Sequence, residues 1–100
     1  MIEVRESAEF SIWLDRLGAS DRKARTIVAA RILRVEAGNF GDVRSVGDKV
    51  SELRIDYGPG YRAYFTQVGR VVVFMLCGGD KATQAKDIAK AKRMAAELHR

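Results

Sequence analysis

The sequence has 100 residues, of which 47% are hydrophobic and 31% are charged. This composition is ordinary for a globular protein, and the length suffices for one hydrophobic core, so we expect a single domain over residues 1–100. No run approaches the ~20 consecutive apolar residues of a membrane span, and the first residues, MIEVRESAEF, lack the apolar core of a signal peptide. We therefore expect a cytoplasmic protein with no membrane partner.

The chain is basic, with 18 Lys and Arg against 13 Asp and Glu and a formal net charge of +5. This balance favours an anionic partner, either a nucleic acid or an acidic protein. Cys77 and His99 are the single cysteine and the single histidine. Their isolation excludes an intrachain disulfide, a cysteine-based zinc site and a Ser-His or Cys-His catalytic pair. We interpret Cys77 as a buried apolar residue and expect no cofactor or metal.

The first half of the chain predicts one strand and two helices. Residues 2–5 predict a short strand. Apolar residues then recur at the i, i+3, i+4, i+7 spacing of one helix face, namely Phe10, Trp13, Leu14 and Leu17. We place this helix between a Ser7 cap and Gly18, and a second helix between a Ser20 cap and about Ala37. The second helix carries basic residues between its apolar ones, among them Arg22, Arg25 and Arg31.

Residues 39–48 predict a loop, and the stretch VSELRIDYGPGYRAYF that follows predicts a β-hairpin because apolar residues alternate on both sides of Gly-Pro-Gly. Pairing Tyr57 with Tyr61 leaves a three-residue loop of a common hairpin length. The opposite face then carries three pairs: Asp56 with Arg62, Arg54 with Tyr64, and Glu52 with Thr66. We expect one face of the hairpin to join the core and the other to form an exposed polar patch.

The last part of the chain predicts a strand and a helix. Residues 71–77 form a continuous apolar run rich in β-branched residues, typical of a central strand covered on both faces. We expect Gly78-Gly79 to end it and Asp80 or Thr83 to cap a final helix that reaches about Leu98. That helix has few large apolar residues and should dock weakly. The predicted order is β-α-α-β-β-β-α, an α+β fold whose antiparallel sheet is covered on one face by the two long helices.

These blocks resemble a known family. The stretches LRIDYGPGYRAYF and VVVFMLCGGDKATQAKDI, with the element order and the length, are similar to the RelE/ParE toxin superfamily, and specifically to its HigB-like addiction module killer branch. The resemblance covers essentially the whole chain. Its most specific part is the pair of blocks GPGYR and LCGGDKATQ at this spacing.

The resemblance implies the toxin of a toxin-antitoxin pair. The implied partner is a small helix-turn-helix antitoxin, and the complex would bind operator DNA through that antitoxin. Many relatives cut mRNA on the translating ribosome without a metal, whereas others resemble ParE and inhibit DNA gyrase. One fold hosts both activities, so both remain open, as does an inactive relic that only binds antitoxin.

The resemblance also implies roles for particular residues. Arg62 matches the strand arginine that holds the scissile phosphate in RelE-like ribonucleases, and Lys81 matches a basic residue just after the last strand. Arg54 falls near a strand lysine that acts as a base or stabilises charge, although the turn length differs. The three cations suit phosphate oxygens, for which arginine offers fork-shaped donors. We predict that Arg54, Arg62 and Lys81 form the catalytic cluster.

The sequence departs from the family pattern at two places. Glu52 stands where the RelE-like site is basic, and no tyrosine lies near Asp87 to stack on a base. Two hypotheses compensate: Glu52 acts as general base, and Tyr64 offers the stacking surface. Arg22, Arg25 and Arg31 would add contacts to ribosomal RNA phosphates. The structural alternatives are a surface ion pair between Asp56 and Arg62 and an ordinary solvated face for the second helix.

Overall fold

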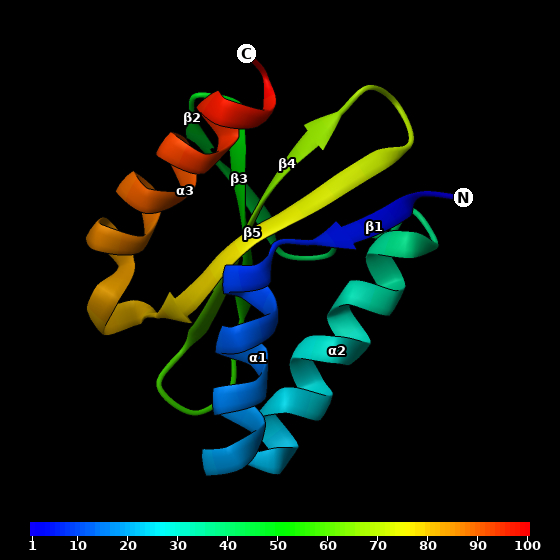
Figure 1. The fold of residues 1–100 in the computed structure, drawn as a ribbon. Coiled ribbons are helices and arrows are strands. Elements are labelled where there is room, and N and C mark those ends of the chain that lie inside the picture. The colour runs from blue at the N-terminus through cyan, green and yellow to red at the C-terminus, as the bar shows by residue number, and fades with distance from the viewer.

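The computed structural model describes residues 1–100 as a five-stranded mixed β-sheet with three α-helices (Figure 1). The elements in chain order are β1 (Glu3–Glu6), α1 (Ala8–Ser20), α2 (Arg22–Glu36), β2 (Val43–Gly47), β3 (Val50–Ile55), β4 (Tyr61–Val68), β5 (Val72–Asp80), a 3₁₀ turn (Lys81–Thr83) and α3 (Gln84–Leu98). The strands are ordered β1-β5-β4-β3-β2 across the sheet. No α-helix combines the length and the apolar composition that a membrane-spanning helix requires.

The predicted helices are present, with corrected ends. Ser7 caps α1 as predicted, since its hydroxyl accepts a hydrogen bond from the Phe10 amide at 3.0 Å. Gly18 does not end this helix, which continues to Ser20. The cap of α2 is Asp21 and not Ser20, because the Asp21 carboxylate accepts from the Ala24 amide at 3.0 Å. The two helices are therefore joined by a single non-helical residue.

The sheet differs from the prediction in three ways. The segment predicted as a loop contains β2, which pairs with β3 in antiparallel fashion. β1 pairs with β5 in parallel, so the sheet is mixed and not antiparallel throughout. β5 continues through Gly78 and Gly79, which pair with Ala63 and Arg62 of β4. The glycines serve close packing here, because a Cβ at Gly78 would overlap the Trp13 ring of α1.

The register of the β3–β4 hairpin is shifted by two residues from the predicted one. Ile55 pairs with Tyr61, so Arg54 lies opposite Arg62 and Glu52 lies opposite Tyr64. The loop has five residues, 56–60, in place of three. It is stabilised by a hydrogen bond from the Gly60 amide to the Tyr57 carbonyl at 3.1 Å. A shift of two keeps every side chain on its predicted face.

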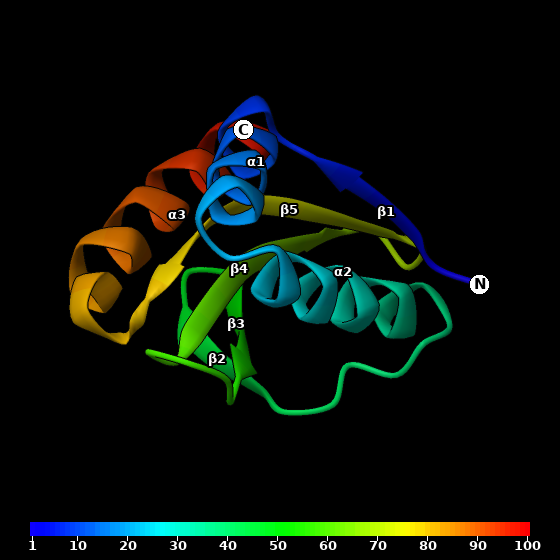
Figure 2. The same cartoon turned by 90° about the horizontal axis from the view of Figure 1, so that it is seen from below.

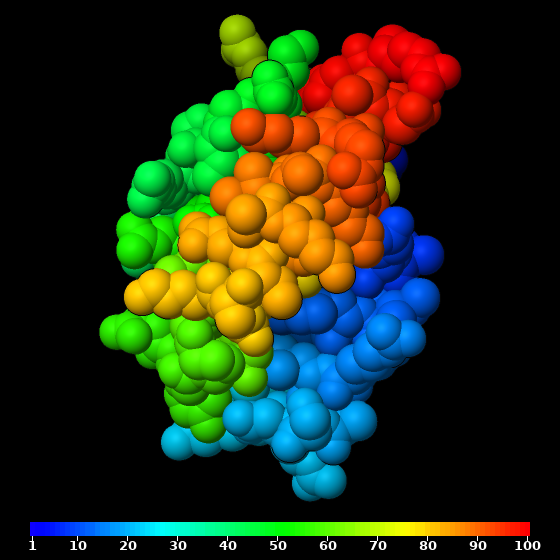
Figure 3. All heavy atoms as spheres, turned by 90° about the vertical axis from the view of Figure 1, so that its left-hand side faces the viewer, coloured from blue at the N-terminus to red at the C-terminus, as the bar shows by residue number.

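Two cores lie on opposite faces of the sheet. α1 and α2 share one core with inward residues of β3, β4 and β5, including Leu53, Ile55, Phe65, Val73 and Met75. α3 lies on the other face, where Ala91 and Ala95 pack with Val50, Tyr64, Leu76 and Cys77. Figures 2 and 3 show α3 on its own side of the molecule, away from α2 and beside the strands that it covers. The polar face of the hairpin is therefore largely buried, and the prediction that it is exposed is wrong.

Candidate anion-binding site

A polar pocket of about 400 Å³ lies beside the β3–β4 loop, and no hydrophobic side chain lines it. Its lining residues are Asp42, Arg54, Asp56, Gly58, Pro59, Gly60, Arg62 and Lys81. We call it the hairpin pocket. The structure thus brings together the three cations that the sequence singled out, and it does so from three separate segments of the chain.

Arg54 and Arg62 are direct cross-strand partners on β3 and β4. Like charges that face each other across a ladder are destabilising, because their side chains lie within a few ångströms. Sequence reasoning had separated them by placing Asp56 opposite Arg62. The observed pairing concentrates positive charge at one point of the sheet, as an anion-binding site requires.

Lys81 reaches the same pocket from the end of β5. A Cβ built on Gly60 would lie 3.7 Å from both Arg62 Nη1 and Lys81 Cβ, so both residues border the loop at this glycine, whose φ of 83° favours glycine. The turn that places Lys81 is held by Asp80, whose carboxylate accepts from the Ala82 amide at 2.8 Å and the Thr83 amide at 3.3 Å. Asp80 thus caps the 3₁₀ turn, whereas the N-cap position of α3 is Thr83, whose side chain makes no capping hydrogen bond. The turn leaves Lys81 exposed.

Arg62 is held from behind by a buried acidic residue. Only 6% of Arg62 and 1% of Glu52 is exposed, and Arg62 Nε lies 3.7 Å from Glu52 Oε1. The other carboxylate oxygen of Glu52 accepts a hydrogen bond from Gln84 Nε2 of α3 at 2.8 Å. Arg62 Nη1 donates to the Tyr61 carbonyl at 3.1 Å. The ion pair and the Nη1 hydrogen bond hold the guanidinium at the pocket wall, while Arg62 Nε and Glu52 Oε1 make no hydrogen bond.

Two hypotheses about this face need correction. Glu52 does not line the hairpin pocket, so its carboxylate positions Arg62 and does not meet a ligand. Tyr64 is completely buried, and its hydroxyl has no hydrogen-bond partner. Burial, followed by the negative charge of Glu52, raises the pKa of Tyr64. A buried ring offers no face to a nucleobase, and the cause in both cases is the docking of α3.

The basic residues of α2 do not line the pocket. Arg31 is structural: its guanidinium donates to the carbonyls of Arg54 at 2.6 Å, Phe40 at 3.0 Å and Asp42 at 3.2 Å. Partial burial lowers the pKa of Arg31. Arg22 and Arg25 are exposed, and Arg25 lies 3.6 Å from Asp15. Contacts of Arg22 and Arg25 with RNA stay a prediction, whereas Arg31 is occupied in holding the 40–42 segment against β3.

Three residues of the site were missed by sequence reasoning. Asp42 and Asp56 line the pocket and bring its carboxylates, and Gln84 holds Glu52 from α3. Asp56 was assigned to a strand, and Asp42 to a loop with no known neighbour. No local pattern identifies Asp42 and Gln84, because both reach the site through tertiary packing. Asp56 was placed on the polar face of the hairpin, but as the ion-pair partner of Arg62.

The fold and the pocket define a small basic α+β protein with a cationic site on its sheet. The sequence is 47% identical over 97 residues to a protein of Haemophilus influenzae described as uncharacterized, and the match covers 97% of this chain and 96% of that protein. The chain belongs to the same family as this Haemophilus protein. No family model matches the sequence, and no solved structure matches it.

Proposed function

We propose that this protein is the toxin of a toxin-antitoxin pair, of the RelE/ParE superfamily and its HigB-like branch, and that it cuts mRNA on the ribosome. The observation that carries the proposal is the meeting of Arg54, Arg62 and Lys81 in one polar pocket. The two sequence blocks on which the resemblance rests support it too. GPGYR supplies the loop and Arg62, and LCGGDKATQ supplies Lys81, so both blocks contribute to the same pocket wall.

The reaction would be attack of a ribose 2′-oxygen on the adjacent phosphorus. The new O–P bond gives a 2′,3′-cyclic phosphate, and the bond to the 5′-oxygen breaks to give a 5′-hydroxyl. Negative charge grows on the non-bridging oxygens, which the guanidinium groups of Arg54 and Arg62 stabilise. The fixed position of Arg62 against Glu52 means that little reorganisation is needed as this charge develops.

Two protons must move during this step. The 2′-hydroxyl proton needs an acceptor, and the carboxylates of the hairpin pocket are Asp42 and Asp56, both exposed to solvent. We assign this role to Asp56, which lies on the loop next to the cations, in place of Glu52. The leaving 5′-oxygen takes a proton, and the Lys81 ammonium is the donor at the pocket wall.

The proposal includes partners and a location. A helix-turn-helix antitoxin would neutralise the basic toxin and attach the complex to operator DNA, and an acidic segment suits a surface with a net charge of +5. The substrate is mRNA on the ribosome, which places the protein in the cytoplasm. The structure differs from the fold that the resemblance implied in two ways: it contains the additional strand β2, and β1 pairs with β5 in parallel.

A cell-free translation assay with primer extension on the mRNA tests the proposal. Arg62→Lys keeps a charge beside Glu52 but loses the fork of donors, so we expect cleavage to fall by about a hundredfold or more. Lys81→Gln and Asp56→Asn should reduce it as well. Lys86→Gln is the matched control, because Lys86 is exposed on α3 and lies outside the pocket. Equal cleavage by Arg62→Lys and Lys86→Gln would contradict the proposed site.

A gyrase supercoiling assay run in parallel tests the second candidate. The burial of Glu52 and Tyr64 favours gyrase inhibition, because a buried Glu52 cannot act as general base and a buried Tyr64 cannot stack on a base. Inhibited supercoiling with intact mRNA would make the hairpin pocket a protein-binding surface of the ParE kind. If neither target responds while the antitoxin still binds, the chain is a relic without toxic activity.

A further inference from the structure

A second pocket, of about 390 Å³, lies between α3 and the turn that joins β2 to β3. Six residues line it: Asp48, Lys49, Lys92, Ala95, Ala96 and His99. We call it the α3 pocket. It adjoins the Val50–Thr66 end of the β3–β4 pair, whereas the hairpin pocket adjoins the Arg54–Arg62 end. The two pockets share no residue, and the proposed function makes no use of the α3 pocket.

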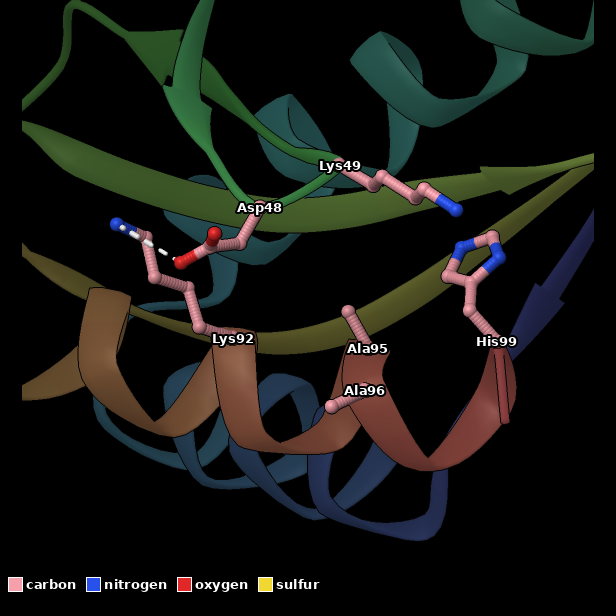
Figure 4. A pocket seen from close by; sticks show the side chains of 6 residues that line it. All are labelled: Asp48, Lys49, Lys92, Ala95, Ala96 and His99. Carbon is pink, nitrogen blue, oxygen red and sulfur yellow. Dashed lines mark ion pairs between the residues drawn. The ribbon is translucent and has the colours of Figure 1, made fainter.

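The charged groups of this pocket are mostly cationic. Figure 4 shows the Lys49 side chain extending toward the same end of the pocket as the His99 ring, and Lys92 directed toward Asp48. Lys92 Nζ lies 3.6 Å from Asp48 Oδ2, and 73% of the Asp48 side chain is exposed. An exposed ion pair at this distance contributes little free energy, so it restrains the two side chains only weakly. The Lys92 ammonium therefore keeps donors available for another anion.

The hydrogen bonds around His99 define which ring nitrogen carries a proton. Thr66 Oγ1 donates its only hydrogen to the Lys49 carbonyl at 2.6 Å, so it acts as an acceptor toward His99 Nε2 at 2.9 Å. Nε2 therefore carries the hydrogen in either protonation state. Thr66 thus links the backbone of Lys49 to the imidazole of His99, and it fixes the two walls of the pocket relative to one another.

The turn itself is strained. Asp48 and Lys49 have φ angles of 52° and 65°, and they are the non-glycine residues of the chain with positive φ. Both central residues of a two-residue hairpin loop of this kind favour glycine or asparagine. A lysine retained in such a conformation suggests a use for its side chain, since strained backbone concentrates at functional sites.

We propose that the α3 pocket binds a phosphate group. Lys49 and Lys92 supply ammonium donors from opposite walls, the His99 ring lies beside Lys49, and the small side chains of Ala95 and Ala96 leave the space open. Figure 4 places the Lys49 ammonium at the His99 end of the pocket and the Lys92 ammonium at the Asp48 end, so their flexible stems turn inward over Ala95 and Ala96 when both bind one phosphate. The phosphate can belong to an RNA chain or to a small free phosphate compound, and the chemistry of recognition is the same.

An NMR titration of the ¹⁵N-labelled protein tests this site, with inorganic phosphate and with a short 2′-O-methyl RNA as separate probes. The modified RNA has no 2′-hydroxyl, so binding is measured without cleavage. We expect phosphate to shift the amide signals of residues 47–49 and 95–99. If it leaves these signals unchanged at concentrations that shift others, the proposal is wrong.

Paired double variants identify the residues responsible. Lys49→Asn with Lys92→Gln removes two charges from the pocket, and asparagine suits the positive φ of position 49. Lys86→Gln with Arg93→Gln removes two charges from exposed positions of the same region outside the pocket. We expect the first variant to weaken inorganic phosphate binding by about tenfold and the second by less than about twofold. Equal weakening by both would show diffuse attraction to a basic surface and would overturn the site.

The RNA probe distinguishes the two sources of phosphate. A pocket variant whose RNA binding loses roughly 0.7 unit of salt dependence relative to the control places one RNA phosphate in the site. Weaker binding of inorganic phosphate with unchanged RNA binding assigns the site to a free phosphate compound. Both outcomes are independent of cleavage, so the site and the ribonuclease proposal can fail separately.

Discussion

Arg54 lies directly opposite Arg62 across the β3–β4 ladder. A folded protein gains nothing in stability from two like charges in this position. An anion between them would turn the repulsion into attraction. The two arginines therefore favour anion binding at the expense of folding stability. Replacing one of them should raise the stability and weaken the binding of an anion.

Replacing Arg54 by Gln tests this opposition. The change removes one charge of the pair, so we expect the free energy of unfolding in urea to rise by about 0.3–1 kcal/mol while cleavage of mRNA falls. Arg44→Gln is the control, because Arg44 is an exposed basic residue on β2. A variant Arg54→Gln that is less stable than the native protein would contradict the repulsion.

The buried ion pair of Glu52 with Arg62 should be costly to break. Glu52→Ala leaves a guanidinium buried without its counterion, and we expect a loss of roughly 3–5 kcal/mol in chemical denaturation. Adding Arg62→Met should restore part of that loss, because the unpaired charge is gone. Glu97→Ala is the control: its partner is the exposed Arg100, and the loss should stay below about 0.5 kcal/mol. Additive losses in the double variant would mean that the two residues do not interact.

Much of the fold could be predicted from the sequence because local signals agree with tertiary structure. The spacing of Phe10, Leu14 and Leu17 gives the buried face of α1, and the alternation around Leu53 and Ile55 gives the core face of the hairpin. The strand β2 was missed because its residues, VRSVG, have almost no buried side chains and carry no apolar alternation. It forms because β3 offers an unpaired edge.

The site was predicted in part, for a physical reason. Its cations could be found because arginines on strands and a lysine after a strand are visible in the sequence. Whether Glu52 and Tyr64 face water depends on where α3 docks, and a helix whose buried residues are mainly Ala91 and Ala95 gives little signal of its partner. The register also escaped prediction, since a shift of two residues preserves the alternation on both strands.

Two glycine-to-alanine changes should have opposite effects. A Cβ at Gly78 would overlap the Trp13 ring, which is held between Phe10 and Tyr61, so Gly78→Ala should cost about 1–3 kcal/mol. A Cβ at Gly18 would meet the flexible side chain of Arg25, which can move aside. Gly18 lies inside α1, where alanine favours the helix by ~0.5–1 kcal/mol.

Thermal unfolding of the two variants under the same conditions compares these effects. We expect the Tm of Gly78→Ala to fall by several degrees and that of Gly18→Ala to stay level or rise. Trp13→Leu combined with Gly78→Ala should recover part of the loss, because the smaller side chain makes room for the methyl group. A fall of the same size in both single variants would contradict the packing difference between Gly78 and Gly18.

Cys77 should be unreactive in the folded protein. Burial, followed by the negative charge of Asp87, raises the pKa of the Cys77 thiol to about 12. The thiol donates to the Asp87 carbonyl at 3.6 Å beneath α3. The thiolate is the form that attacks a disulfide reagent, so labelling at pH 8 should be slow in buffer and fast in urea.

The pH dependence of stability follows from the same shift. The unfolded chain ionises its cysteine near ~8.5, whereas the folded protein keeps the thiol neutral up to about pH 12. The unfolded state therefore binds fewer protons in this window, and the contribution of Cys77 to stability is lost as the pH rises from about 8.5 to 12. Cys77→Ala lacks this ionisable thiol, so its urea midpoint should decline less than that of the native protein between about pH 8 and pH 10.

The labelling experiment needs an exposed thiol as its reference. Adding Ser45→Cys to the Cys77→Ala variant places a thiol on an exposed strand and gives this reference rate. A native rate equal to that reference would mean that α3 does not stay docked over Cys77 in solution.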